Sequence, residues 1–173
     1  AAAQPAHRRP DWTAPPGMSR FDFAAAHAAR WEHIELLAQA SGLPVLLKGV
    51  LRVDDALEAA QRGAAGLVVS NHGGRTLDTA IGAIDALPPI VDALGGRLPL
   101  LVDGGIRRGT DVLKAIALGA DAVLVGRPQF YALAAGGAQG VAQMLRLLRD
   151  ELEIAMALTG CRTLADAAGM LRR

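Results

Sequence analysis

Four short stretches of this 173-residue chain combine glycine with ionisable or hydrogen-bonding residues. Each follows a short run of Leu and Val, which is typical of a strand buried on both faces. Parallel strands bring their carboxyl ends to one edge, where ligands bind in α/β proteins. We therefore take as candidate functional residues the stretches Lys48-Gly49, Ser70-Asn71-His72-Gly73-Gly74-Arg75, Asp103-Gly104-Gly105-Ile106-Arg107-Arg108-Gly109 and Gly126-Arg127-Pro128.

The third and fourth stretches have the composition of a phosphate site. Glycines such as Gly104-Gly105 and Gly126 carry no Cβ, so backbone amides can approach an anion closely. Arg107 and Arg127 can each donate paired hydrogen bonds, and a helix that begins near Thr110 would add its positive end. The alternative is a pair of glycine-rich turns with solvated arginines. Two such turns on consecutive strands favour the phosphate site.

His72 and Arg75 are the candidates for acting on a substrate. An imidazole can take a proton near neutral pH, and a guanidinium can bind a planar carboxylate through two parallel hydrogen bonds. Taken alone, the string H-G-G-R also fits a turn histidine beside a surface arginine. Lys48 fits equally well a fixed cation at the mouth of its strand or a lysine that reaches solvent.

Helical segments separate the four apolar runs at 45–47, 67–69, 100–102 and 123–125. One helix is expected from near Asp54 to Gly63 and another from near Thr110 to Gly119, with Asp and Thr as caps at the start and Gly at the end. Alternating strands and helices predict parallel pairing with right-handed crossovers, in an open sheet or in part of a barrel. A complete eightfold βα barrel needs about 250 residues, so this chain alone cannot form one.

The first 28 residues differ from the rest of the chain. They contain four prolines and no hydrophobic period, so we expect a Pro-containing surface loop or linker over 1–28 and the folded domain over 29–173. A helix that ends at Gly42 would precede the first strand.

Composition and charge exclude several functional classes. Apolar residues make up 51% of the chain and charged residues 20%, which is typical of a globular protein. A net charge of +1 predicts no binding of nucleic acid or anionic lipid, and no segment is apolar enough to span a bilayer. No metal-ligand spacing is present. A single cysteine, Cys161, favours a reducing cytoplasm.

In their order and spacing, the four stretches closely resemble the FMN-dependent α-hydroxy acid dehydrogenases and oxidases, which include glycolate oxidase, lactate oxidase, L-lactate dehydrogenase and mandelate dehydrogenase. The resemblance covers roughly residues 29 to 165, and S-N-H-G-G-R is its most specific part. It implies the carboxyl-terminal half, strands five to eight, of a TIM (β/α)8 barrel. A different flavin barrel, such as a type 2 isopentenyl diphosphate isomerase relative, offers no reason for His72 and Arg75 together.

The resemblance also implies FMN as cofactor and a role for each candidate residue. Lys48 would stabilise the negative charge of the reduced flavin, and Ser70 would help to hold the ring. His72 would be the catalytic base that takes a proton from a small L-2-hydroxy acid, and Arg75 would bind the substrate carboxylate. The ribityl chain and phosphate would be held by Asp103, Gly104, Gly105, Ile106, Arg107, Gly126 and Arg127.

The first four strands of that family have no counterpart in this chain. We therefore expect a fragment or truncated product whose partner is the missing amino-terminal half-barrel or another copy in a homo-oligomer. An alternative function is that of a non-catalytic half-barrel that binds FMN or phosphate, or only pairs with another half. The substrate side chain and the acceptor that reoxidises the flavin are left open by these motifs.

Overall fold

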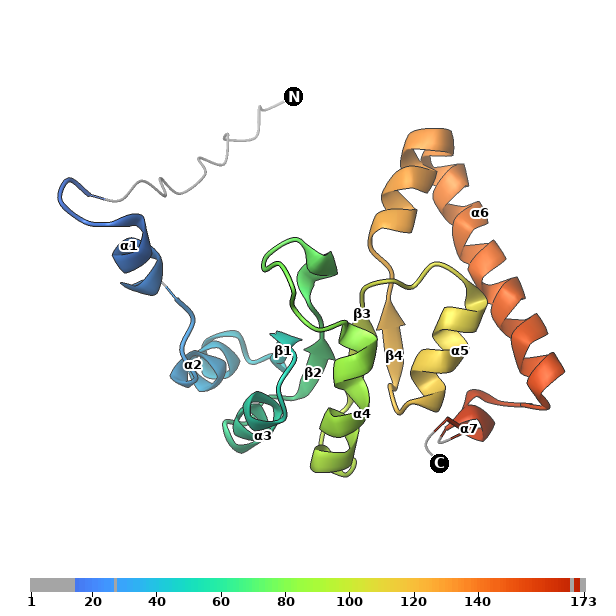
Figure 1. Ribbon diagram of the computed structural model, residues 1–173, viewed down its shortest axis with the longest axis horizontal. Helices are drawn as coiled ribbons and strands as arrows, with labels where there is room; N and C mark the ends of the chain where they lie inside the picture. Colours follow the sequence, from blue (N-terminus) through green and yellow to red (C-terminus); the bar gives the residue numbers. More distant parts are fainter. Residues whose placement is uncertain (1–14, 27, 169, 172–173) are drawn as a thin grey trace.

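The computed structural model describes residues 15–26, 28–168 and 170–171, and its core is a four-stranded parallel sheet. The strands are β1 (Leu46–Val50), β2 (Gly66–Val69), β3 (Leu100–Asp103) and β4 (Ala122–Leu124). They lie side by side in chain order, from left to right in Figure 1. Each crossover therefore leads to the next strand in the same direction, as in a barrel, whereas the strand order of a doubly wound sheet reverses.

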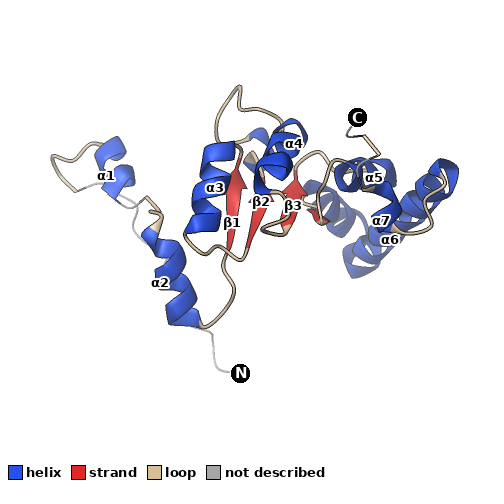
Figure 2. Ribbon diagram, turned by 90° about the horizontal axis from the view of Figure 1, so that it is seen from below, coloured by secondary structure: helices blue, strands red, loops and turns tan. Residues whose placement is uncertain are grey.

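Seven α-helices in the described residues connect and flank the strands. Three of them pack on the sheet: α3 lies on β1 and α4 on β2 and β3 (Figure 2), and α5 packs on β4. The longest helix, α6, packs against α5 and is divided by non-helical backbone at Gly136 and Gly137. The helices are α1 (Arg20–Ala26), α2 (Glu32–Ser41), α3 (Val53–Gln61), α4 (Ala83–Leu94), α5 (Gly109–Ala117), α6 (Arg127–Thr159) and α7 (Leu164–Ala167), with a short 3-10 turn, η1 (His72–Gly74).

The core lies between the two central strands and the helices that cover them. Five large side chains of this core are almost completely buried: Leu67 from β2, Val102 from β3, and Leu87, Ile90 and Leu94 from α4. Removing such side chains from water contributes roughly 1.5–3 kcal/mol each, so this layer holds the strand ends in place.

The two outer strands correct one expectation from the sequence. All four apolar runs form strands within one to three residues of the expected positions, but only β2 is buried along its whole length. Leu46 of β1 and Leu124 of β4 remain 45% and 39% exposed, because each of these strands has a neighbour on one side only within the described residues. The prediction that every strand is buried on both faces is therefore wrong for β1 and β4.

The helix ends confirm the glycine caps and correct the polar ones. Gly42 ends α2 in the left-handed conformation, with φ of 66°. At the start of α3 the N-cap residue is Arg52, and no side chain caps the helix. Asp54 lies instead in the first turn and pairs with Arg52 at 3.0 Å, so its predicted capping role is wrong.

Part of the predicted loop over 1–28 is helical. Residues Arg20–Ala26 form α1, and the Ser19 hydroxyl accepts a hydrogen bond from the Asp22 amide at 3.0 Å. None of the residues of α1 is buried, so this helix contributes no side chain to the core. The part of the prediction that concerns 1–14 and 27 lies outside the described residues.

The described residues contain neither a membrane-spanning helix nor a cluster of metal-binding side chains. Across 15–26, 28–168 and 170–171, no helix has the length and apolar character needed to cross a bilayer. The same residues contain no group of three or more His, Cys, Asp or Glu side chains that could hold a metal ion.

Candidate functional site

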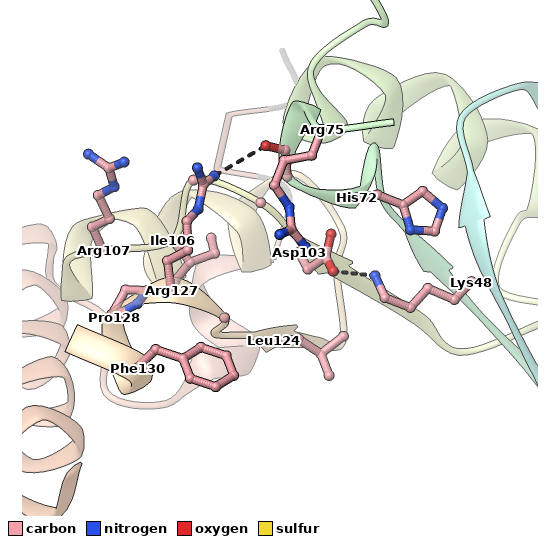
Figure 3. A pocket seen from close by; sticks show the side chains of 14 residues that line it. Lys48, His72, Arg75, Asp103, Ile106, Arg107, Leu124, Arg127, Pro128 and Phe130 are labelled. Atoms are coloured by element: carbon pink, nitrogen blue, oxygen red, sulfur yellow. Dashed lines mark hydrogen bonds and ion pairs between the residues drawn. The ribbon is translucent and has the colours of Figure 1, made fainter. Parts of the chain in front are cut away.

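A cavity of about 280 Å³ opens at the carboxyl ends of the four strands (Figure 3). It brings together residues that lie up to 82 positions apart in the chain, from Lys48 to Phe130. Every residue to which the family resemblance gave a role lines it except Ser70, which is fully buried directly after β2. Of the other residues in the four candidate stretches, Gly49, Asn71, Gly74, Arg108 and Gly109 do not line it. The cavity is lined by Lys48, His72, Gly73, Arg75, Asp103, Gly104, Gly105, Ile106, Arg107, Leu124, Gly126, Arg127, Pro128 and Phe130.

The charges of this cavity favour an anion. Lys48, Arg75, Arg107 and Arg127 contribute four cations to the lining, against the single carboxylate of Asp103. Within the described part of the chain, no carboxylate forms an ion pair with any of the three guanidinium groups. Unpaired guanidinium groups bind phosphate and carboxylate through paired, charge-assisted hydrogen bonds.

A buried serine organises the first two strand ends. The Lys48 Nζ donates a hydrogen bond to the Ser70 Oγ at 2.7 Å and forms an ion pair with the Asp103 carboxylate. The Ser70 Oγ also accepts a hydrogen bond from the backbone amide of His72 at 3.1 Å. Ser70 therefore acts from below the cavity, holding both the ammonium group and the start of the histidine loop.

The second oxygen of Asp103 has no partner. Its Oδ1 is buried, and no hydrogen bond reaches it from the described residues. A buried carboxylate oxygen without a donor costs free energy, so this atom is suited to accept a hydroxyl group of a bound ligand.

The loop after β2 places His72 in an unusual backbone conformation. His72 has a φ of 55°, which few residues other than glycine adopt. The Asn71 side chain supports the turn, because its Oδ1 accepts from the Gly74 amide at 3.1 Å and its Nδ2 donates to the Ile81 carbonyl at 3.2 Å. Asn71 had no role predicted from the sequence, although an asparagine with two glycines shortly after it is a recognisable turn signal.

The start of α5 differs from the expectation of a free, positive helix end. The amides of Arg107 and Arg108 both donate to the Asp111 Oδ2 at 3.0 Å. The Gly109 amide donates to the Glu151 Oε2 on α6 at 2.9 Å. Carboxylates therefore already occupy these amides, and the expectation that this helix end helps to bind a phosphate is wrong for them.

The start of α6 offers the helix end that α5 does not. The kink at Gly136 and Gly137 separates its first nine residues as a short helix, whose N-cap Gly126 and first residue Arg127 line the cavity. In the loop after β3, Gly104 and Gly105 also line the cavity, and their φ of 88° and 80° turn the backbone sharply. In βα barrels, phosphate commonly binds between the loops after the last two strands and a short extra helix.

The cavity also has an apolar wall that the sequence motifs did not reveal. Leu124 and Phe130 both line it, and the Phe130 side chain is 63% exposed. Figure 3 shows the Phe130 ring below Arg127, at the start of α6. The sequence did hold a signal for Phe130. It lies three positions after Arg127, and residues three positions apart share one face of a helix.

Comparison with known proteins agrees with this geometry. Residues 3–173 match the family of FMN-dependent dehydrogenases. The chain belongs to the FMN-dependent dehydrogenase family. It is 55% identical over 139 residues to an L-lactate oxidase of Nostoc sp., covering 80% of this chain and 38% of that protein. It is 53% identical over 136 residues to glycolate oxidase 3 of Arabidopsis thaliana, covering 79% of this chain and 37% of that protein.

Solved structures of this FMN-dependent dehydrogenase family share the fold. The structure of a mandelate oxidase with (S)-2-phenylpropionate matches with a TM-score of 0.80 and 51% identity, over 91% of this chain and 47% of that chain. The chain thus spans less than half of the length of these relatives. The resemblance inferred from the motifs and the barrel-type fold are confirmed.

The cavity fits the group that gives the FMN-dependent dehydrogenases their name. FMN carries a phosphate, a ribityl chain with hydroxyl groups and a flavin ring. Arg107 and Arg127 offer the phosphate guanidinium groups that no carboxylate in the described residues neutralises, and the free Oδ1 of Asp103 offers an acceptor to a hydroxyl group. Lys48 offers a cation that can face the ring.

Proposed function

We propose that this chain provides the FMN-phosphate site, the catalytic base and the carboxylate clamp of an enzyme that oxidises a small L-2-hydroxy acid to the 2-oxo acid. One observation carries the proposal. His72 and Arg75 share a cavity with two arginines that no carboxylate neutralises in the described residues, so a carboxylate substrate and a phosphate can be held together. The names of the relatives, lactate oxidase and glycolate oxidase, point to the same reaction class.

The phosphate end of the site determines where the cofactor lies. Arg107 and Arg127 hold the phosphate together with backbone amides near Gly104-Gly105 and Gly126. Asp103 accepts a hydrogen bond from the ribityl chain, and Lys48 favours negative charge on the flavin ring. When bound, FMN supplies a two-electron acceptor. The chain's own residues orient it and place the substrate.

The remaining steps belong to Arg75 and His72. Arg75 binds the substrate carboxylate, so the carbon that carries the hydroxyl group is held near the histidine. Oxidation removes two electrons and two protons from the hydroxy acid. The Nε2 of His72 accepts one of these protons, and the other leaves with the electron pair. A guanidinium stays protonated throughout, so Arg75 cannot take over the proton transfer.

A flavin titration tests this proposal. We expect the chain to bind FMN much more tightly than riboflavin, since riboflavin lacks the phosphate. Anaerobic addition of L-lactate, glycolate or L-mandelate should bleach the bound flavin, and His72→Gln should abolish the bleaching while FMN stays bound. Equal affinity for FMN and riboflavin, or normal bleaching by the variant, would contradict the assignment.

The open edges of the sheet favour a second candidate function. Leu46 and Leu124 are exposed on the two outer strands, and unpaired strand edges favour association. In this alternative the chain binds FMN but turns over only after pairing with an amino-terminal half-barrel or with another copy. Bound FMN that no hydroxy acid bleaches would select this alternative, and turnover by a monomer would exclude it. The cytoplasmic location stays a prediction.

A further inference from the structure

Gly49 interrupts the regular pairing of β1 with β2. Lys48 pairs with Val68 and Val50 pairs with Val69, so Gly49 is an extra residue between two consecutive pairs. Its φ is 101°, a backbone conformation that side chains disfavour. A bulge of this kind kinks a strand, and bulges next to active sites often redirect a side chain.

The imidazole of His72 occupies the space next to Gly49. A Cβ built on Gly49 would lie 2.7 Å from the His72 Nε2 and 3.4 Å from its Cε1. Carbon and nitrogen atoms do not approach to 2.7 Å without bonding, so the ring and a side chain at position 49 exclude each other. Figure 3 shows the His72 ring on the side of its loop that faces Lys48, the neighbour of Gly49 on β1.

The backbone of His72 has little freedom to move away. Its amide is bound to the buried Ser70 Oγ, and the Asn71 side chain closes the turn on the Gly74 amide. His72 is an exposed residue, so its ring can turn toward solvent. A methyl group at position 49 would therefore turn the ring outward and leave the loop in place.

We propose that Gly49 is a positioning residue, which sets the orientation of the His72 imidazole by leaving the space that the ring fills. The inference rests on the proposed role of His72 as the base. Gly49 would matter for proton transfer and not for holding FMN, because the phosphate donors lie on the loops after β3 and β4. This role of Gly49 explains why β1 carries a bulge at the residue that follows Lys48.

The experiment compares Gly49→Ala with Gly63→Ala. Gly63 also has a positive φ, 78°, but a Cβ there meets no atom within 4 Å, so this control carries the backbone cost alone. The first readout is the Cε1–H resonance of His72 in two-dimensional NMR, assigned with His72→Gln. The second is FMN affinity. The third is flavin bleaching by L-lactate, where a displacement of the base should slow the reaction about 100-fold.

We expect Gly49→Ala to shift the His72 resonance, to slow bleaching and to keep FMN affinity, while Gly63→Ala leaves all three readouts unchanged. An unshifted His72 resonance in Gly49→Ala would overturn the inference, as would an equal shift in Gly63→Ala. Failure of the wild-type chain to bind FMN would contradict the proposed function instead. The resonance shift would then still decide whether Gly49 orients the ring.

Discussion

The Arg127 guanidinium donates a hydrogen bond from its Nη2 to the carbonyl oxygen of Gly73 at 3.3 Å. Arg127 begins α6 after β4, and Gly73 follows His72 in the loop after β2, so this bond passes across the end of β3. One side chain therefore contacts both the proposed phosphate site and the loop that carries the proposed base. This bond makes the two ends of the cavity interdependent.

Replacing Arg107 should weaken the binding of FMN without affecting riboflavin. A hydrogen bond to a charged group contributes roughly 1.5–3 kcal/mol, so we expect Arg107→Ala to raise the dissociation constant about 10- to 100-fold. Arg108→Ala is a matched control, because Arg108 is the next residue, lies outside the cavity lining and faces Glu151 at 3.8 Å. Quenching of flavin fluorescence measures the FMN dissociation constant of both variants. An equal loss in the two variants would show that net charge and not contact is responsible.

Arg127→Ala should affect both FMN binding and the loop that carries His72, whereas Arg107→Ala should affect FMN binding alone. It should weaken FMN binding, and it should also release the Gly73 carbonyl and loosen the turn around His72. Arg127→Lys keeps the charge but not the forked geometry of the guanidinium, so it should restore part of the FMN affinity. NMR of His72 measures the second effect. A His72 spectrum unchanged in Arg127→Ala would show that the bond to Gly73 does not hold the loop.

Ser70→Ala should destabilise the chain although it removes a single oxygen atom. The Ser70 Oγ is fully buried and accepts hydrogen bonds from Lys48 and from the His72 amide. Leaving these donors without an acceptor should cost about 1–3 kcal/mol of unfolding free energy. Denaturant unfolding measures it, with the exposed Ser41→Ala as control. Equal stability of the two variants would mean that water replaces the lost acceptor.

Gly109→Ala should destabilise the contact between α5 and α6. A Cβ at Gly109 would clash with the backbone nitrogen of Leu152, so the two helices would have to separate. Overpacking typically costs about 1–3 kcal/mol, and we expect at least the upper part of this range because the clash is with backbone. Gly136→Ala is the control, because a Cβ there meets no atom within 4 Å and its φ of −150° carries no left-handed strain. Thermal unfolding compares the two, and similar midpoints would contradict the close packing.

The carboxyl group of Asp166 should make the start of α7 sensitive to acid. Hydrogen bonds from the backbone amides of Thr163 and Arg162, at 2.7 and 2.8 Å, lower the pKa of Asp166. Because the folded pKa lies below the unfolded one, this stabilisation is complete above the ordinary carboxyl pKa and is lost as the pH falls through the lowered value. Carbon NMR of the side chain should show the low midpoint. Asp166→Asn should remove this part of the acid dependence, and an ordinary midpoint in the wild type would exclude it.

Local sequence signals were sufficient to predict the strands and most of the residues that line the cavity. Short runs of Leu and Val bounded by glycine marked β2 and β3, and the residues after each run indeed converge, because parallel strands end at one edge. His72, Arg75, Arg107 and Arg127 were found in this way. Their convergence follows from strand order alone, so it needs no knowledge of side-chain packing.

Contacts between distant residues could not be predicted in the same way. Glu151 satisfies the Gly109 amide from 42 positions away, so this amide is not free for the expected phosphate. Ser70 lies beneath the cavity and not in its wall, and Phe130 joins the wall because α6 begins beside the loop after β3. These facts depend on how helices pack on the sheet.

The sequence by itself determined the order of strands and helices, the identity of the residues at the strand ends and the family resemblance, since these depend on neighbours in the chain. Only the tertiary structure decided which amides are already paired, which strand faces remain exposed and why position 49 carries glycine. The physical reason is that hydrogen-bond satisfaction and steric exclusion depend on three-dimensional distance, as between Gly49 and the His72 ring.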